Sequence, residues 1–279
     1  MRQPLLLVLG VCLLASPEAR HQPLLVQAGP WTGSSALPVP AQDGGQRAAR
    51  QRQIAPVCSD ADWLTRPERD ETEQPEKVLD ALKIPEGAAV ADVGAGVGYF
   101  TWRLAKRVGP KGRVIAEDLQ PKMLELLEEN LKKRNVTNVE LVLGTRDDPR
   151  LPEGALDLAL LVDVYHELSE PEAMMRHIRR ALKPGGRLVL IEYRKEDPSI
   201  PILPLHKMSV AEARAEIEPL GFKFQQALEF LPMQHILIFT SKPASKQAVS
   251  ACCLPVLSGA APGISAERLP APFPLRRAA

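Results

Sequence analysis

Hydrophobic and polar positions follow two alternating patterns along the middle of the 279-residue chain. Short apolar runs bounded by turn residues alternate with segments whose apolar positions recur every three or four residues, as in amphipathic helices. The runs predict strands at residues 90–93, 113–116, 139–143, 156–162 and 187–191. The runs at 114–116 and 156–161 are almost continuously apolar, as strands covered on both faces require. Two further runs, at 222–230 and 235–240, flank a Leu-Pro-Met-Gln turn and predict a closing hairpin. This alternation predicts an α/β domain with a parallel sheet and right-handed crossover helices.

The residues on either side of this pattern have a different composition. Residues 20–60 and 242–279 are rich in Pro, Gly, Ala and polar residues and show no apolar periodicity. Such composition predicts a disordered linker and a disordered tail. We therefore expect one folded domain at residues 61–241, a length of roughly 180 residues that suffices for a single α/β core.

Residues 1–19 have the charge pattern of a short signal peptide, because Arg2 precedes an apolar run from Leu5 to Ala15. The run is too short for a bilayer-spanning helix, which needs about 20 residues, and no clean A-x-A cleavage site follows it. Two interpretations stay open. The segment is a signal or short anchor of an exported or envelope-anchored protein, or it is a non-native start on a cytoplasmic enzyme.

A glycine-rich loop follows the first predicted strand. The strand ends at Asp92, and Gly94, Gly96 and Gly98 then alternate before an amphipathic helix begins. Glycines at these positions allow positive φ and leave room for a ligand against the main chain, and the helix N-terminus offers free N–H groups. A dinucleotide-binding G-x-G-x-x-G loop needs its third glycine where this chain has Tyr99. The loop therefore predicts a nucleotide-type cofactor other than a dinucleotide.

Further elements follow this loop at regular spacing. Asp118 ends the second run, Asp147 follows the third, and Leu-Lys-Pro-Gly-Gly opens the segment 182–189. Together with the glycine loop, this order resembles the class I S-adenosylmethionine (SAM)-dependent methyltransferases. The resemblance spans residues 63–241, and segments within it are similar to an uncharacterised bacterial subgroup of that family.

The resemblance implies a fold, a cofactor and a set of cofactor-binding residues. The fold is a three-layer α/β/α sandwich around a seven-stranded, mostly parallel Rossmann-like sheet whose last strand is antiparallel. The cofactor is SAM. Asp92 and the three glycines would form its loop, Asp118 would hold the ribose, and Asp147 would lie near the adenine amino group.

The segment 163–167 follows the fourth strand, at the sheet edge where open α/β sheets bind ligands. We place Asp163 with the cofactor-binding residues, and we place Tyr165 and His166 as candidate catalytic residues that face the methyl acceptor. His166 is a candidate base because the pKa of histidine lies near neutrality. The alternative is that His166 makes only a structural hydrogen bond. The segment lacks the two prolines of the Asn/Asp-Pro-Pro-Tyr signature, which disfavours DNA-adenine methylation.

Three other predictions concern the surroundings of this edge. Trp63, Arg66 and Arg69 precede the first long helix, where the family often has a lid over the cofactor; the alternative is an ordinary charged helix entrance. Residues 192–194 end the fifth strand and are candidates to line the acceptor pocket. His206 and His235, by contrast, are expected to be ordinary structural or surface histidines.

Composition narrows the function classes. The net charge is +1 and aromatic residues make up 4%, so neither a basic field nor an aromatic platform predicts nucleic acid as a partner. The cysteines Cys12, Cys58, Cys252 and Cys253 all lie outside residues 61–241. We therefore expect no disulfide in the domain, and no metal site of C-x-x-C type.

The functional prediction is methyl transfer from SAM to a small-molecule acceptor by in-line displacement, with oxygen or carbon favoured over nitrogen. One alternative is a SAM-binding module without turnover. The other is a nicotinamide-dependent oxidoreductase, which the glycine spacing disfavours. Membrane contact is expected only through residues 1–19, and the sequence does not indicate an oligomeric state.

Overall fold

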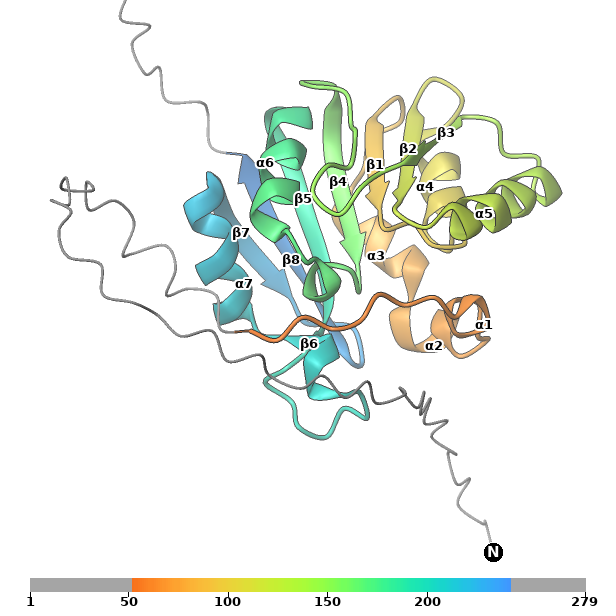
Figure 1. Ribbon diagram of the computed structural model, residues 1–279. Helices are drawn as coiled ribbons and strands as arrows, with labels where there is room; N and C mark the ends of the chain where they lie inside the picture. The colour runs from red at the N-terminus through yellow and green to blue at the C-terminus, as the bar shows by residue number, and fades with distance from the viewer. Residues whose placement is uncertain (1–51, 242–279) are drawn as a thin grey trace, which may run out of the picture. The chain divides into compact units, whose positions relative to one another are not determined.

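The structure is a computed structural model that describes residues 52–241 (Figure 1). The predictions for residues 1–19, 20–51 and 242–279 lie outside the described residues. Among residues 52–241, every helix is too short or too polar to cross a bilayer.

A single sheet forms the centre of the domain, with the main strand order β3-β2-β1-β4-β5-β8-β7. Strands β1 to β5 along this path pair in parallel, and β8 runs antiparallel to both β5 and β7 (Figure 1). The seven strands of this path confirm the predicted Rossmann-like sheet with an antiparallel last strand. Their bounds are β1 (Ala89–Val93), β2 (Arg113–Asp118), β3 (Val139–Leu143), β4 (Leu156–Val162), β5 (Leu182–Arg194), β7 (Phe222–Leu228) and β8 (Gln234–Ser241).

An eighth strand, β6 (Lys207–Met208), was not expected from the sequence. It pairs in parallel with Tyr193 and Arg194 at the end of β5. The predicted fifth strand was also too short, since β5 begins at Leu182 and not at residue 187. The long β5 and the short β6 together hold the segment after β5 against the edge of the sheet at which the parallel strands end.

Helices cover both faces of the sheet, which completes the predicted three layers (Figure 1). Two successive residues of β1 show this arrangement, because their side chains point to opposite faces of the sheet. Val90 packs in a core cluster with α3 and α4, whereas Ala91 packs in a second cluster with α6 and α7. Helix α5 adds Leu127 and Leu131 to a third cluster against β2. The helices are α1 (Ala61–Leu64), α2 (Arg69–Glu73), α3 (Pro75–Leu82), α4 (Thr101–Val108), α5 (Pro121–Lys133), α6 (Pro171–Ala181) and α7 (Val210–Ile217), with short 3₁₀ turns η2 (Tyr165–Glu167), η3 (Pro204–His206) and η4 (Glu218–Leu220).

Residues 52–60, which we call the N-terminal strap, correct the predicted linker boundary. Composition placed them in a disordered segment, but they pack on the domain. Arg52 forms an ion pair with Glu216 of α7 at 3.2 Å and donates to the backbone oxygen of His166 at 2.9 Å. Ala55 is buried, and its N–H donates to the same backbone oxygen.

The second half of the strap reaches the other side of the sheet edge. The N–H of Cys58 donates to the carboxylate of Glu167 at 3.2 Å, and the carbonyl of Cys58 accepts from the Gln120 side chain at 2.9 Å. Figure 1 shows this segment in orange, running across the edge at which β4 ends. Ala55 and Cys58 of the strap are held through backbone groups, which carry no signal in side-chain periodicity, and this explains why composition missed the strap.

Candidate functional site

The glycine loop adopts the backbone that its sequence predicts. Gly94, Gly96 and Gly98 have φ of +70°, +55° and +86°. At Gly94 the absence of a side chain also allows close packing, because a Cβ there would lie 2.5 Å from a methyl carbon of Val164. The loop after β1 is therefore fitted directly against the loop after β4.

Asp118 lies at the end of β2 with its carboxylate against this loop. One carboxylate oxygen accepts from the N–H of Gly96 at 2.8 Å, and the other accepts from the N–H of Gln120 at 2.8 Å. The side chain is buried, and burial raises the pKa of Asp118 above its ordinary value. Asp118 thus lies at the position that the sequence indicates, and its contact with a ribose stays a prediction.

Two further acids lie at the same loop. The Asp92 carboxylate accepts from the Thr101 hydroxyl at 2.6 Å, which joins the end of β1 to the first residue of α4. Burial raises the pKa of Asp92 to about 6. Glu117 was not predicted as a site residue, yet it is buried with its carboxylate 3.4 Å from the N–H nitrogen of Gly94, and burial raises its pKa to about 8. A site with three buried acids favours a ligand that carries positive charge.

Asp147 lies in the turn after β3 and is exposed. Its carboxylate accepts from the Thr145 hydroxyl at 2.7 Å. The neighbouring Asp148 accepts from the N–H of Arg150 at 2.7 Å and therefore shapes the same turn. The adenine contact of Asp147 stays a prediction.

Asp163 follows β4 in a left-handed backbone conformation, with φ of +55°. One of its carboxylate oxygens accepts from the Gln234 side chain at 2.8 Å. The other oxygen is buried and has no hydrogen-bond partner among residues 52–241. Burial and the nearby charges of Glu73 and Glu192 hold the pKa of Asp163 well above its usual range. An unpartnered buried carboxylate oxygen of this kind is suited to a cationic ligand group.

His166 is paired with a buried carboxylate from the neighbouring strand. Its Nδ1 lies 2.6 Å from an oxygen of Glu192 in β5, and both side chains are almost completely buried, at 1% and 0% exposure. The second oxygen of Glu192 accepts from the N–H of Tyr165 at 2.9 Å. Burial alone would lower the pKa of His166, but the charge and hydrogen bond of Glu192 outweigh burial and raise it.

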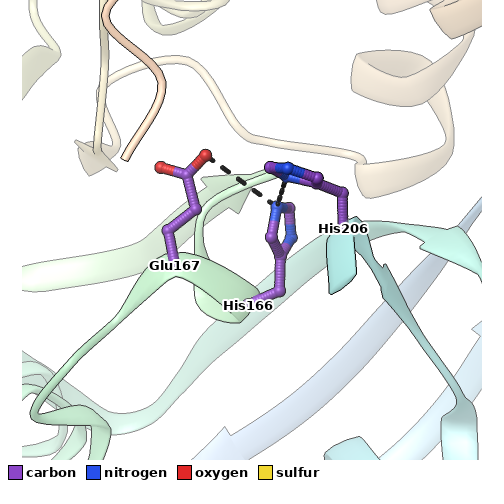
Figure 2. Close-up of side chains that lie close together, drawn as sticks. All are labelled: His166, Glu167 and His206. Atoms are coloured by element: carbon purple, nitrogen blue, oxygen red, sulfur yellow. Dashed lines mark hydrogen bonds and ion pairs between the residues drawn. The ribbon is translucent and has the colours of Figure 1, made fainter. Parts of the chain in front are cut away.

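The other nitrogen of His166 faces two side chains. Its Nε2 lies 3.1 Å from Nδ1 of His206 and 3.9 Å from an oxygen of Glu167 (Figure 2). Burial raises the pKa of Glu167 to about 7, and burial together with His166 lowers the pKa of His206. His206, expected to be an ordinary structural or surface histidine, therefore belongs to the cluster around His166.

Tyr165 occupies a different place from the one predicted. Its ring is fully buried in the hydrophobic core cluster that β4, β5 and α6 share, and the guanidinium of Arg52 lies 5.8 Å from its centroid. This position corrects the prediction that Tyr165 faces the acceptor. A local pattern after a strand does not show which of two adjacent side chains turns into the core.

The helices α1 and α2 cover the glycine loop, as the predicted lid would. A Cβ at Gly96 would lie 3.0 Å from the Leu64 side chain. The guanidinium of Arg66 contacts Glu73 at 3.0 Å and the Tyr193 hydroxyl at 3.2 Å, so the same segment also reaches the end of β5. A single N-terminal segment thus spans from the glycine loop to the strand that carries Glu192.

Comparison with known proteins identifies the family. A family model described as a methyltransferase domain matches residues 90–186. The crystal structure of a SAM-dependent methyltransferase from Aquifex aeolicus superposes with a TM-score of 0.62 and 30% identity, over 65% of this chain and 96% of that one. The chain belongs to the class I SAM-dependent methyltransferases. The cofactor of that family is SAM, which confirms the cofactor that the resemblance implied.

Curated relatives of this methyltransferase share a shorter region. The ubiquinone/menaquinone biosynthesis C-methyltransferase UbiE of Pasteurella multocida is 32% identical over 132 residues, which are 47% of each chain. A demethylmenaquinone methyltransferase of Lactococcus lactis is 31% identical over 144 residues, 51% of this chain and 55% of that protein. The chain thus spans about half the length of these curated relatives.

The residues of this methyltransferase fit SAM on independent grounds. SAM carries a sulfonium and an ammonium group, and the loop region supplies the buried acidic side chains of Asp92 and Asp118. Asp163 adds the unpartnered oxygen described above. The three glycines of the loop have positive φ, and α4 begins directly after the loop, so its N-terminus lies next to these residues.

Proposed function

We propose that the protein is an enzyme that transfers the methyl group of SAM to a small-molecule acceptor, on carbon or oxygen. Supporting this proposal, one relative is named a ubiquinone/menaquinone biosynthesis C-methyltransferase and another a demethylmenaquinone methyltransferase, so both names refer to small-molecule methylation. The net charge of +1 gives no field that would attract a nucleic acid.

The observation that carries the proposal is the buried His166–Glu192 pair next to Asp163. When Nδ1–H of His166 donates to Glu192, Nε2 keeps a lone pair that faces Nδ1 of His206, and an acceptor would have to take the place of the His206 nitrogen there. This lone pair can accept the proton of an acceptor hydroxyl or of an acidic carbon, and Glu192 then stabilises the imidazolium. The acceptor becomes nucleophilic without a solvent base.

SAM supplies an electrophilic methyl group when it is bound. The protein must hold it, exclude water and align the acceptor with it. The strap contacts His166 and the α1–α2 segment contacts Tyr193, so both are placed to shield this edge of the sheet from water. Asp163, whose carboxylate has one buried oxygen without a hydrogen-bond partner among residues 52–241, is the candidate contact for the cationic part of the cofactor.

The test measures methyl transfer from labelled SAM to a panel of phenols, quinols and carbon acids, with His166→Asn beside the unchanged protein. We expect the substitution to lower turnover by about 10²- to 10⁴-fold, the usual contribution of a general base. The affinity for SAM should change by less than about threefold because His166 acts on the acceptor side. His177→Asn, on α6, is the matched control for loss of an imidazole.

Two results would contradict the proposal in different ways. Full turnover in His166→Asn would show that His166 is not the general base, while the proposal of methyl transfer would remain. Tight SAM binding without label transfer to any acceptor, including those of a cell extract, would favour the SAM-binding module without turnover.

A further inference from the structure

Three potential metal ligands meet at one point beside the acceptor edge. They are His166 and Glu167 on η2 and His206 on η3, and their ligand atoms all lie within 4.8 Å of one another. Figure 2 shows His166 between the other two side chains, with its Nε2 facing both. Because His166 and His206 are 40 residues apart, no spacing motif in the sequence predicts this metal cluster.

The buried pair with Glu192 prepares His166 for ligation. A metal-binding imidazole usually donates its second N–H to a carboxylate, which fixes the tautomer and the orientation of the ring. Glu192 provides this contact at 2.6 Å from Nδ1, and its own side chain is 0% exposed. The remaining lone pair on Nε2 therefore points at Nδ1 of His206.

The distances are close to those that a tetrahedral ion requires. Two nitrogens bound to zinc at about 2.0–2.1 Å lie about 3.3 Å from each other when the angle at the metal is tetrahedral. The two imidazole nitrogens here are 3.1 Å apart, and the Glu167 oxygen is 3.9 Å from the first of them. The Glu167 ligand atom lies within 4.8 Å of the other two, so its side chain must move by roughly one ångström to reach tetrahedral spacing from both nitrogens.

We propose that His166, His206 and Glu167 bind one divalent transition-metal ion of the zinc type. Two imidazoles and one carboxylate suit zinc, cobalt or iron(II) better than magnesium or calcium, which prefer oxygen ligands. Three protein ligands leave an open coordination position, as catalytic metal sites do. The carboxylates of Glu167 and Glu192 offset the two charges of the ion.

The surrounding structure holds these ligands in place. The N–H of Cys58 in the strap donates to both oxygens of Glu167. Strand β6 anchors the end of η3, and the Lys207 ammonium donates to the backbone oxygen of Ile200 at 2.7 Å, which closes the loop before His206. Such support from surrounding groups is what distinguishes a built site from a chance encounter of side chains.

The metal and a proton would compete for the same lone pair on His166. In the metal-bound protein, Nε2 would be a ligand and no longer a base, and the cation would stabilise an acceptor that is already present as an oxyanion. The metal-free protein retains the base described above. Metal binding itself does not depend on methyl transfer, so this inference and the proposed function fail independently.

The experiment titrates the chelator-treated full-length protein with Zn²⁺ by calorimetry and with Co²⁺ by visible absorption. We expect one equivalent of Zn²⁺ with micromolar or tighter affinity and a tetrahedral Co²⁺ spectrum. His206→Ala should weaken binding at least tenfold. Glu167→Gln should weaken it in the same direction, and both variants should retain the circular dichroism spectrum of the parent.

Controls separate this site from other ligands in the chain. His177→Ala removes a partly exposed imidazole of α6 and should leave the titration unchanged. The protein has four cysteines, and thiolate ligation would show as an intense near-ultraviolet charge-transfer band with Co²⁺. That band, an unaltered titration in His206→Ala, or no bound Zn²⁺ in the parent would each overturn the proposal.

Discussion

The two halves of the site are built in different ways. In the cofactor half, the loop after β1 contacts the end of β2, and the N–H of Gly96 meets Asp118 only 22 residues away. In the acceptor half, His166 contacts Glu192 across 26 residues, His206 across 40 and Arg52 across 114. The first half is a continuous motif, and the second is assembled from separate strands and turns.

This difference explains why a family resemblance predicts the cofactor half of the site better than the acceptor half. A loop, a strand and a helix in sequence order bind the part of SAM that every member of the family shares. The acceptor half depends on which turns follow β4 and β5, and such loops vary while the scaffold stays constant. The predictions below test whether the two halves are as separable as their construction indicates.

The largest effect is expected at Asp118. Asp118→Asn places an amide NH₂ opposite the N–H of Gly96 or of Gln120, and it removes the charge from two hydrogen bonds worth about 1.5–3 kcal/mol each. We expect the affinity for SAM to fall at least about 100-fold by calorimetry. Metal binding at the cluster should be unaffected, because Asp118 belongs to the other half.

Asp147→Asn serves as the control for Asp118→Asn, since Asp147 is exposed and contacts only its own turn through Thr145. A loss of less than about tenfold is expected there. Equal losses in the two variants would show that net charge, and not the carboxylate against the loop, governs SAM affinity.

A smaller effect is expected where the two halves touch. Gly94→Ala introduces a Cβ 2.5 Å from Val164 at a residue with φ of +70°. We expect the free energy of unfolding to fall by about 2–4 kcal/mol, from backbone strain of about 1–2 kcal/mol together with overpacking. Urea denaturation measures this loss.

The double variant Gly94→Ala/Val164→Ala divides the loss into its two causes. In the Val164→Ala background, Gly94→Ala should lose only the stability that backbone strain costs, because the Val164 methyl groups that cause the overpacking are gone. If the second substitution restores nothing, the contact between the two loops does not limit stability, and the halves are more independent than the structure indicates.

The smallest effect concerns pH and Glu117. Its pKa is about 8 in the folded protein and about 4.5 when unfolded, so the unfolded state is charged first as the pH rises. Stability from this group is therefore greatest below about pH 4.5 and falls through the window up to about pH 8, by at most about 1.4 kcal/mol per pH unit.

Glu117→Gln should remove this component of the pH dependence. Urea unfolding at pH 6 and pH 7.5 should show a smaller loss of stability on raising the pH in the variant than in the parent. Parallel curves for the two proteins would mean that Glu117 is solvated or paired when the protein is folded, contrary to its burial beneath Gly94.

The sequence predicted the sheet well because each strand carries its own signal. The apolar run at β4 matches the observed strand, since burial on both faces requires near-continuous apolar residues. The run at β3 also has the observed bounds, although β3 lies at the edge of the sheet and its residues are only partly buried or exposed. Two-residue β6 was missed because so short a strand has no periodicity to detect. The start of β5 was missed because it contains Pro184, Gly185 and Gly186, which normally indicate a turn.

Site residues were predictable to the extent that their partners lie close in sequence. Asp92, Asp118 and Asp163 all lie at the strand ends from which they were inferred. Glu192 was recognised only as a candidate for the acceptor pocket, and nothing in its neighbourhood indicates a bond to His166. Tyr165 shows the opposite error, because a position at the correct edge does not determine whether a side chain turns outward or into the core.

The N-terminal strap has a consequence for synthesis on the ribosome. Arg52 is made early, but its partner Glu216 is made 164 residues later. At roughly 5–20 residues per second, translation separates the two by about ten seconds or more. During that interval the nascent chain can already form β1, β2 and the glycine loop between them, whereas the strap has no α7 to bind. The acceptor half should therefore be the last part of the enzyme to mature.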